Sequence, residues 1–139
     1  MSAGATVSEG VKTAYEALRT DQKHRYVVYN LNDKNVIEAE ATGERSVTFE
    51  DFLEKLRQSY ADQCRWAVYD YVATVQDGTT REKKVFITWC PKQANMRQQM
   101  IYKASTDVLR KHLDGICGQV QASSFEDVEG EVKAALHCQ

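Results

Sequence analysis

Hydrophobic positions along the chain follow two periods, one helical and one extended. Apolar residues at helical spacing predict helices over about 7–18, after Thr48, over about 93–113, and from Ser124 towards Leu136. Runs rich in β-branched and aromatic residues predict strands over 25–31, 36–41, 64–75, 82–89 and 116–121. Turn residues at 32–35 and 76–80 join two pairs of strands into hairpins. We therefore expect an α+β fold, with a central mixed β-sheet of about five to six strands flanked by about four helices.

The three shorter helical patterns each carry apolar residues on one side. Thr48–Asp51 and Ser124–Asp127 resemble capping boxes, in which a hydroxyl accepts a hydrogen bond from a backbone N–H at the start of a helix. The apolar residues that we expect to face the core are Val7, Val11, Ala14, Tyr15 and Leu18, then Phe52, Leu53 and Leu56, then Val128, Val132 and Leu136. Residues 1 to about 6 are small and polar, so we expect a mobile tail. Gly43 is expected to end the second strand of the first hairpin.

The longest helical pattern runs from about Gln93 to Leu113. Pro91 ends the strand before it, because proline has no N–H to donate, and Gly115 fits a C-terminal stop. We expect one side of this helix to face the core, with Met100, Ile101, Ala104, Val108 and His112. The opposite side carries a polar stripe of Gln99, Lys103, Thr106 and Arg110, flanked by Met96 and Asp107. A solvated face and a partner surface both fit this stripe.

Composition favours one soluble domain. The chain has 139 residues, of which 42% are hydrophobic and 27% are charged, and its net charge is −2. This charge gives no global basic field, so we expect no nucleic acid as a partner. No apolar run reaches membrane-spanning length, and the N-terminus lacks the features of a signal peptide, so we expect no transmembrane segment and a cytosolic protein.

Cysteines and catalytic motifs indicate neither a metal site nor an enzyme. Cys64, Cys90, Cys117 and Cys138 are scattered without zinc spacing, so we expect free thiols, the first three acting as small core residues and Cys138 exposed. There is no glycine-rich phosphate loop and no G-x-S-x-G motif. Carboxylate pairs lie at helix starts, where they complement the helix dipole. We expect no catalytic residue, no metal and no cofactor.

Several segments carry a resemblance to one family. Residues Met96–Tyr102 followed by Ala104–Asp107 resemble the long-helix signature of the ADF/cofilin family. Cys64–Asp70 is similar to that family's Cys-Arg-Tyr-Ala-x-Tyr-Asp strand, and Val85–Trp89 to its Val-Phe-x-x-Trp strand. The segments occur in the family's order over nearly the whole chain. The resemblance implies a single ADF-homology domain over 1–139, and it implies actin as the partner.

The N-terminal segment Ala3–Val11 resembles the family's tail, which contacts actin and can carry a regulatory phosphoserine. Here Ala3 stands at the serine position, and Ser2 lies one residue earlier. Phosphorylation of Ser2 would add about −1.5 to −2 charges where the tail must dock. The alternative is an exposed N-terminal residue without a regulatory role.

The resemblance also implies which residues bind. The implied surface for actin monomers and filaments comprises Ala3, Gly4, Thr6, Met96, Arg97, Gln99, Met100, Lys103, Thr106, Asp107 and Arg110. The implied additional filament-binding residues are Arg81, Lys83 and Lys133. Gln99 replaces a usual lysine while Lys103 is added, and Lys133 stands among several acidic residues. These departures favour actin binding over strong filament severing.

The implied activity is binding to actin monomers and filaments, followed by severing, depolymerisation and filament turnover. The implied protein is a cytoplasmic monomer at the actin cytoskeleton, with phosphoinositides as a further candidate ligand. An alternative is an ADF-homology protein of the glia maturation factor or coactosin type, which binds Arp2/3 complex or filament sides without depolymerising.

Overall fold

The computed structural model describes residues 5–74 and 77–135. Within these ranges, side chains are described except at Ala73, Thr74, Arg81, Phe125, Glu129, Lys133, Ala134 and Ala135. The elements in chain order are β1 (Thr6–Val7), α1 (Glu9–Arg19), β2 (His24–Leu31), β3 (Val36–Glu44), α2 (Phe49–Ser59), β4 (Arg65–Thr74), β5 (Thr80–Trp89), α3 (Met96–Arg110), β6 (Ile116–Ala122) and α4 (Phe125–Ala135).

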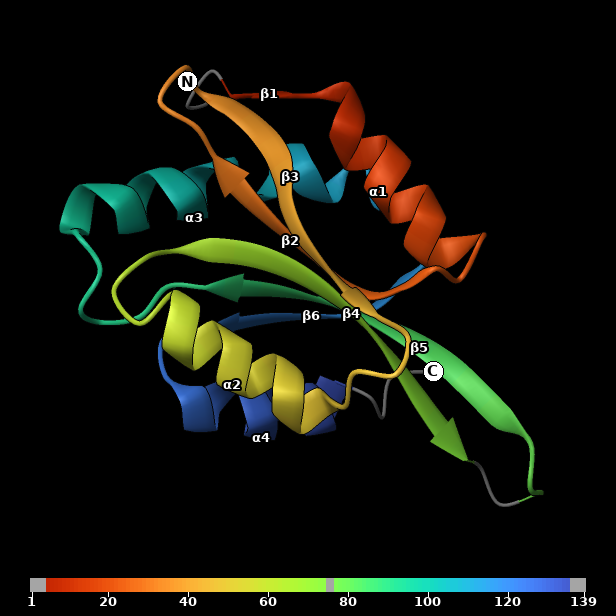
Figure 1. Cartoon of the computed structure of the whole chain (residues 1–139). Coiled ribbons are helices and arrows are strands. Elements are labelled where there is room, and N and C mark those ends of the chain that lie inside the picture. Colours follow the sequence, from red (N-terminus) through yellow and green to blue (C-terminus); the bar gives the residue numbers. More distant parts are fainter. Residues whose placement is uncertain (1–4, 75–76, 136–139) are drawn as a thin grey trace.

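The strands form one mixed sheet. Its order is β1-β3-β2-β4-β5-β6, with parallel pairing at the two outer contacts, β1 with β3 and β5 with β6, and antiparallel pairing between. Figure 1 shows α1 and α3 on one side of this sheet and α2 and α4 on the other. Each face of the sheet is therefore covered, and the predicted α+β class with a mixed sheet is confirmed.

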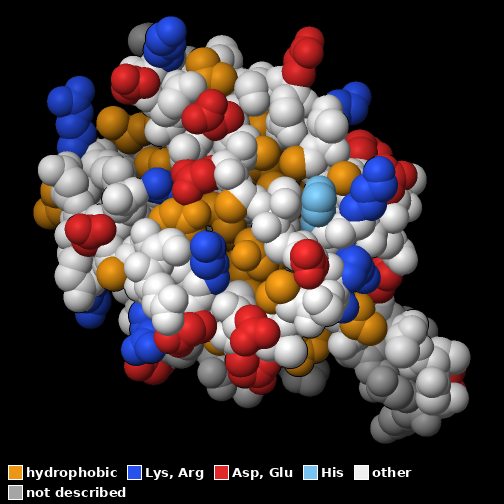
Figure 2. Space-filling view, viewed as in Figure 1, with side chains coloured by type: hydrophobic (Ala, Val, Ile, Leu, Met, Phe, Trp, Pro, Cys, Tyr) orange, Lys and Arg blue, Asp and Glu red, His pale blue; other side chains and the backbone are white. Residues whose placement is uncertain are grey.

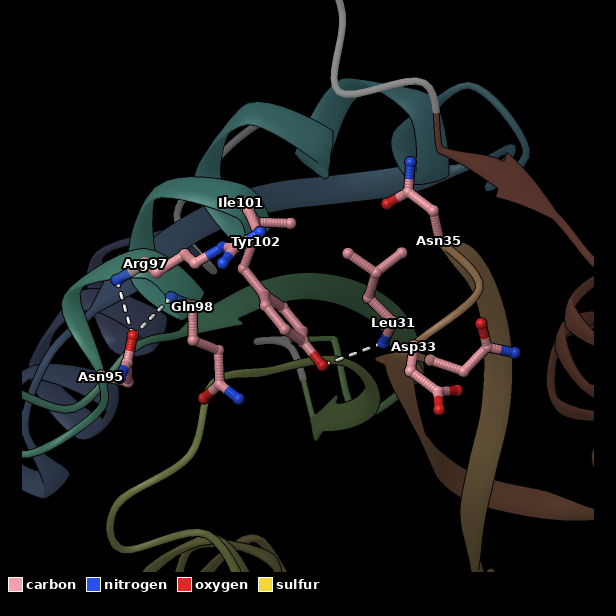
Figure 3. A pocket seen from close by; sticks show the side chains of 9 residues that line it. Leu31, Asp33, Asn35, Asn95, Arg97, Gln98, Ile101 and Tyr102 are labelled. Carbon is pink, nitrogen blue, oxygen red and sulfur yellow. Dashed lines mark hydrogen bonds between the residues drawn. The ribbon is translucent and has the colours of Figure 1, made fainter.

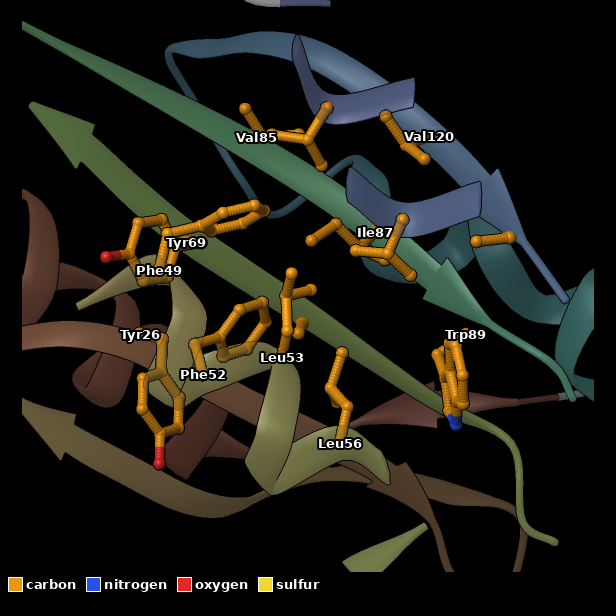
Figure 4. Close-up of a cluster of buried hydrophobic side chains, with 14 of the residues drawn as sticks. Tyr26, Phe49, Phe52, Leu53, Leu56, Tyr69, Val85, Ile87, Trp89 and Val120 are labelled. Atoms are coloured by element: carbon orange, nitrogen blue, oxygen red, sulfur yellow. The ribbon is translucent and has the colours of Figure 1, made fainter. Parts of the chain in front are cut away.

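The core beneath α2 and α4 is rich in aromatic side chains. Thr48 caps α2 by accepting a hydrogen bond from the N–H of Asp51 at 3.1 Å, as predicted. The ring of Phe52 then lies 5.0 Å from that of Tyr26 and 5.0 Å from that of Tyr69. Figure 4 shows this group of rings at one end of the cluster and Trp89 at the other. Aromatic pairs at these separations add to the free energy of burial.

The core beneath α1 and α3 is built from a different set of side chains. Val11, Tyr15 and Leu18 of α1 are at most 1% exposed, which confirms the predicted face of that helix. Trp66 of β4 is fully buried, and its ring centroid lies 4.4 Å from that of Tyr102 on α3. The predicted start of the first helix was too early, because Val7 pairs with Ile37 in β1.

Gly43 was predicted to end a strand, but this prediction is wrong. The residue lies inside β3, opposite Tyr26. A Cβ atom at this position would lie 2.0 Å from Cε2 of the Tyr26 ring, so no larger residue fits without moving the ring. The glycine therefore allows close packing of an aromatic ring on the backbone rather than a break in the strand.

The cysteines differ from one another. Cys64 and Cys90 are buried free thiols, as predicted, whereas Cys117 is half-buried and disulfide-bonded, which corrects the prediction of a free thiol there. Cys138 and Leu136 lie outside the described residues. Across the described ranges, no His, Cys, Asp or Glu residues gather in a group that could hold a metal ion. No helix in those ranges is long and apolar enough to cross a membrane.

Candidate functional site: the outer face of α3 and a projecting hairpin

Helix α3 is shorter than its pattern predicted. Asn95 caps its start, because the Asn95 side-chain oxygen accepts hydrogen bonds from the N–H groups of Arg97 at 2.8 Å and Gln98 at 3.3 Å. The helix ends at Arg110, where the chain tightens into i→i−3 hydrogen bonds, and Gly115 at φ +83° belongs to the turn before β6. The boundaries predicted near Gln93 and Leu113 were each a few residues outside the real ones.

The predicted core side of α3 was wrong. Met100 is 67% exposed, Ala104 and His112 are exposed, and Ile101 and Val108 are only half-buried. The residues that the helix buries are Tyr102, Ser105 and Leu109. The helix is therefore rotated about its axis from the orientation that its apolar residues predict.

Hydrogen bonds to the sheet explain this rotation. The backbone N–H of Leu31, at the end of β2, donates to the hydroxyl of Tyr102 at 2.9 Å. The N–H of Cys64, just before β4, donates to the side-chain oxygen of Gln98 at 2.6 Å. Burial raises the pKa of Tyr102, so its hydroxyl stays neutral. Because unpaired buried N–H groups are costly, these polar side chains must face the sheet.

The polar stripe predicted as one surface divides into two groups. Thr106 is half-buried and accepts a hydrogen bond from the indole N–H of Trp66 at 3.2 Å. Gln99 and Arg110 are half-buried too, and each donates to a backbone carbonyl at 3.0 Å. Lys103 is exposed. Of the stripe, only Lys103 is fully available to a partner.

The residues that α3 presents to solvent form a surface that we call the α3 outer face. It comprises Met96, Arg97, Met100, Lys103, Ala104 and Asp107. Met96 and Met100 are 75% and 67% exposed, one helical turn apart. Flexible thioether side chains adapt to a partner, and the neighbouring charges can orient it. On the side of the molecule seen in Figure 2, acidic and basic side chains are interspersed, so this side has no large patch of one charge.

The predicted filament-binding residues lie elsewhere. Strand β2 pairs with β4 only as far as Tyr69, whereas β4 and β5 pair with each other out to Thr74 and Thr80, so this hairpin projects beyond the sheet (Figure 1). Arg81 belongs to β5 in this projection, but its side chain lies outside the described part. Lys83 is half-buried near the base of the hairpin.

A buried carboxylate braces the base of this hairpin. Asp70 of β4 is fully buried, and its Oδ2 lies 2.8 Å from a guanidinium nitrogen of Arg45 and its Oδ1 3.9 Å from Nζ of Lys84. Arg45 also lies 3.6 Å from a carboxylate oxygen of Glu82. Removing one partner of a buried pair leaves an uncompensated charge, so this network ties the hairpin to Arg45, the residue that follows β3.

The remaining predicted residues are only partly described. Thr6 is exposed in β1, and its N–H donates to the carbonyl of Asn35 at 3.1 Å. Ser2, Ala3 and Gly4 lie outside the described residues, and so does the side chain of Lys133 on α4. Of the predicted binding residues on α3, the structure therefore brings Met96, Arg97, Met100, Lys103 and Asp107 together on the exposed side of the helix.

One feature of this region had no signal in the sequence. A groove of about 780 Å³ lies between the start of α3 and the turn that joins β2 to β3. Figure 3 shows side chains from both segments around it, including Arg97 and Asp33. The two segments are separated by about sixty residues, so no local pattern could have paired them.

These features define a binding domain: a rigid two-sided sheet that presents an exposed helix face and a braced hairpin. The family described as "Cofilin/tropomyosin-type actin-binding protein" matches residues 4–137. A cofilin of Mycosarcoma maydis is 34% identical over 128 residues, covering 92% of this chain and 90% of that protein. Actin-depolymerizing factor 1 of Arabidopsis thaliana is 32% identical over 132 residues, covering 94% and 93%.

A solved structure gives the same result. The crystal structure of Streptomyces griseoflavus cofilin is similar with a TM-score of 0.85 and 33% identity, covering 98% of this chain and all of that one. The chain belongs to the ADF/cofilin family of actin-binding proteins. This confirms the resemblance, and because the family is not enzymatic it also confirms the prediction that the protein is not an enzyme.

Proposed function

We propose that this chain binds actin monomers and filaments and promotes filament severing, depolymerisation and turnover in the cytoplasm. The observation that carries the proposal is the α3 outer face. Met96 and Met100 are large apolar side chains left exposed on a helix that has a well-packed inner side. Membership of an actin-binding family supports actin as the partner of that apolar surface.

The charges around the methionines support the same role. Arg97 and Lys103 are exposed, whereas Gln99 is half-buried with its amide bound to the carbonyl of Ala94. Lys103 therefore supplies the second positive charge of this surface. Close charge pairs at an interface raise association rates and fix the orientation of the partner.

Filament remodelling would follow from binding to two neighbouring subunits. The α3 outer face, with the N-terminal segment, would contact one subunit, while the projecting hairpin with Arg81 and Lys83, and Lys133 of α4, would contact the next. A protein that binds one twisted state of the filament more tightly shifts the filament towards that state. Differential affinity is sufficient, and no bond chemistry is required.

The test is co-sedimentation with actin filaments, combined with the rate of pyrene-actin loss after dilution. The wild type is compared with Arg97→Ala and with Lys55→Ala, a control at an exposed lysine on α2. We expect the wild type and Lys55→Ala to pellet with filaments and to accelerate loss. Arg97→Ala should bind about tenfold more weakly, the scale of a central interface arginine.

Three outcomes separate the parts of the proposal. Equal binding by all three proteins would remove the α3 outer face from the interface. Binding without faster loss on dilution would leave actin binding but exclude the depolymerising activity. A wild type that neither pellets nor changes the pool of soluble actin would overturn the proposed function, and Arp2/3 complex would be tested next.

A further inference from the structure

The groove beside α3 has an apolar floor that the described chain leaves partly open. Leu31 and Ile101 line it and are half-buried, and Tyr102 closes its base with a ring held against the sheet. The whole lining comprises Leu31, Asn32, Asp33, Asn35, Asn95, Arg97, Gln98, Ile101 and Tyr102. Its volume of about 780 Å³ is large enough to receive side chains of a partner.

Both walls of the groove are preformed. On one wall, the side-chain oxygen of Asn32 accepts hydrogen bonds from the N–H groups of Lys34 at 2.9 Å and Val36 at 3.0 Å, which fixes the β2–β3 turn. The hydroxyl of Tyr102 joins the walls by its hydrogen bond with the N–H of Leu31, drawn in Figure 3. A rigid groove loses little conformational entropy when it is filled.

The rims carry opposite charges that lack partners. Arg97 stands on the helix side and Asp33 on the turn side (Figure 3). Both are exposed, and none of the ion pairs in the described part of the chain involves either of them. A complementary segment would place a carboxylate at Arg97, a cation at Asp33, and an apolar side chain between them.

We propose that this groove is a second actin contact, and that it receives a segment of actin carrying an apolar side chain between an acidic and a basic residue. The inference rests on the proposed actin binding. Arg97 belongs both to the α3 outer face and to the rim of the groove, so one docked partner reaches the two surfaces without a gap. Asp33 and Ile101 are then contact residues, and the β2–β3 turn is part of the interface.

The experiment measures the affinity of labelled actin monomers for the wild type and four variants. Asp33→Lys reverses the charge on the rim and should weaken binding about tenfold, since like charges across an interface are strongly unfavourable. Asp62→Lys makes the same change in net charge at an exposed site between α2 and β4. Lys34→Glu alters the same turn at an exposed residue that does not line the groove. Arg97→Ala removes the charge that the groove shares with the α3 outer face, and thermal unfolding checks the fold of each variant.

The results distinguish this proposal from the proposed function. Weak binding by Asp33→Lys with near wild-type binding by both Asp62→Lys and Lys34→Glu supports the groove. If Asp33→Lys binds like the wild type while Arg97→Ala binds weakly, the groove is excluded and actin binding stands. Equal weakening by Asp33→Lys and Asp62→Lys would be an effect of net charge and would also exclude it. If the wild type does not bind actin monomers, both the groove contact and the proposed actin binding are overturned.

Discussion

Helices α2 and α3 pack on opposite faces of one sheet, yet they are held by different forces. In α2, Phe52, Leu53 and Leu56 are at most 2% exposed, so its apolar side is its buried side. In α3, Met96 and Met100 point outward, and the buried side includes the polar residues. Apolar burial orients α2, whereas hydrogen bonds to strand ends orient α3.

The difference indicates what each helix is for. A helix whose apolar residues are all buried has no apolar contact surface left to offer, and α2 fits this description. Helix α3 is anchored through Gln98, Tyr102 and Thr106, and this leaves its methionines available. An exposed apolar helix face is typical of a partner surface, and here it belongs to a member of an actin-binding family.

The largest effect is expected from Phe52→Ala, which tests whether apolar burial holds α2. Its fully buried ring contacts Tyr26 and Tyr69, so truncation should lower the free energy of unfolding by about 3–5 kcal/mol. Urea denaturation measures this, with Lys55→Ala as the exposed control on the same helix. A loss below about 1 kcal/mol would mean that α2 is not held by apolar burial.

The corresponding change in α3 is Tyr102→Phe, which removes only a hydroxyl. The N–H of Leu31 would lose its acceptor, at a cost of about 1–3 kcal/mol in the free energy of unfolding. On the other face, the hydroxyl of Tyr69 donates to the carbonyl of Val47 over 3.3 Å, a longer bond. Tyr69→Phe should therefore cost less, and urea denaturation of the two variants gives the ranking. The reverse ranking would contradict an α3 docked by hydrogen bonds.

Met100→Ala tests the outer face of α3. Because this side chain is 67% exposed, the free energy of unfolding should change by no more than about 0.5 kcal/mol. Actin affinity should fall about tenfold, the effect of a contact worth roughly 1.4 kcal/mol. Fluorescence titration with labelled actin monomers provides the measurement. If Met100→Ala lowers the free energy of unfolding clearly but leaves actin affinity unchanged, Met100 would be a core residue, as first predicted.

Alkaline pH should destabilise the packing on both faces of the sheet. Burial raises the pKa of Tyr69 to about 12 and raises that of Tyr102, against about 10 in an unfolded chain. The unfolded state therefore releases these protons first, so the two tyrosines add no pH dependence to stability well below pH 10, and their contribution falls between about pH 10 and 12. Urea midpoints across this range measure the fall. The fall in the urea midpoint with pH should be shallower in Tyr102→Phe than in the wild type. An equal fall in both proteins would mean that the pKa of Tyr102 is not raised by folding.

Much of the fold could be predicted from the sequence because its signals are local. The capping residues Thr48 and Ser124 each accept a hydrogen bond from a nearby backbone N–H, as their patterns predicted. The two predicted hairpins form, because alternation and turn residues act over a few positions. Gly43 was misjudged, because the ring that requires it comes from Tyr26 on the neighbouring strand.

The sequence by itself determined the α+β class, the approximate limits of the helices and strands, and membership of an actin-binding family, since each depends on neighbouring residues or on motifs in order. Only the tertiary structure decided the rotation of α3, the groove between Asp33 and Arg97, and the brace around Asp70. Hydrophobic periodicity depends only on the spacing of apolar residues along one helix. It carries no information about which N–H groups or charges, distant in sequence, will need a partner there once the chain is folded.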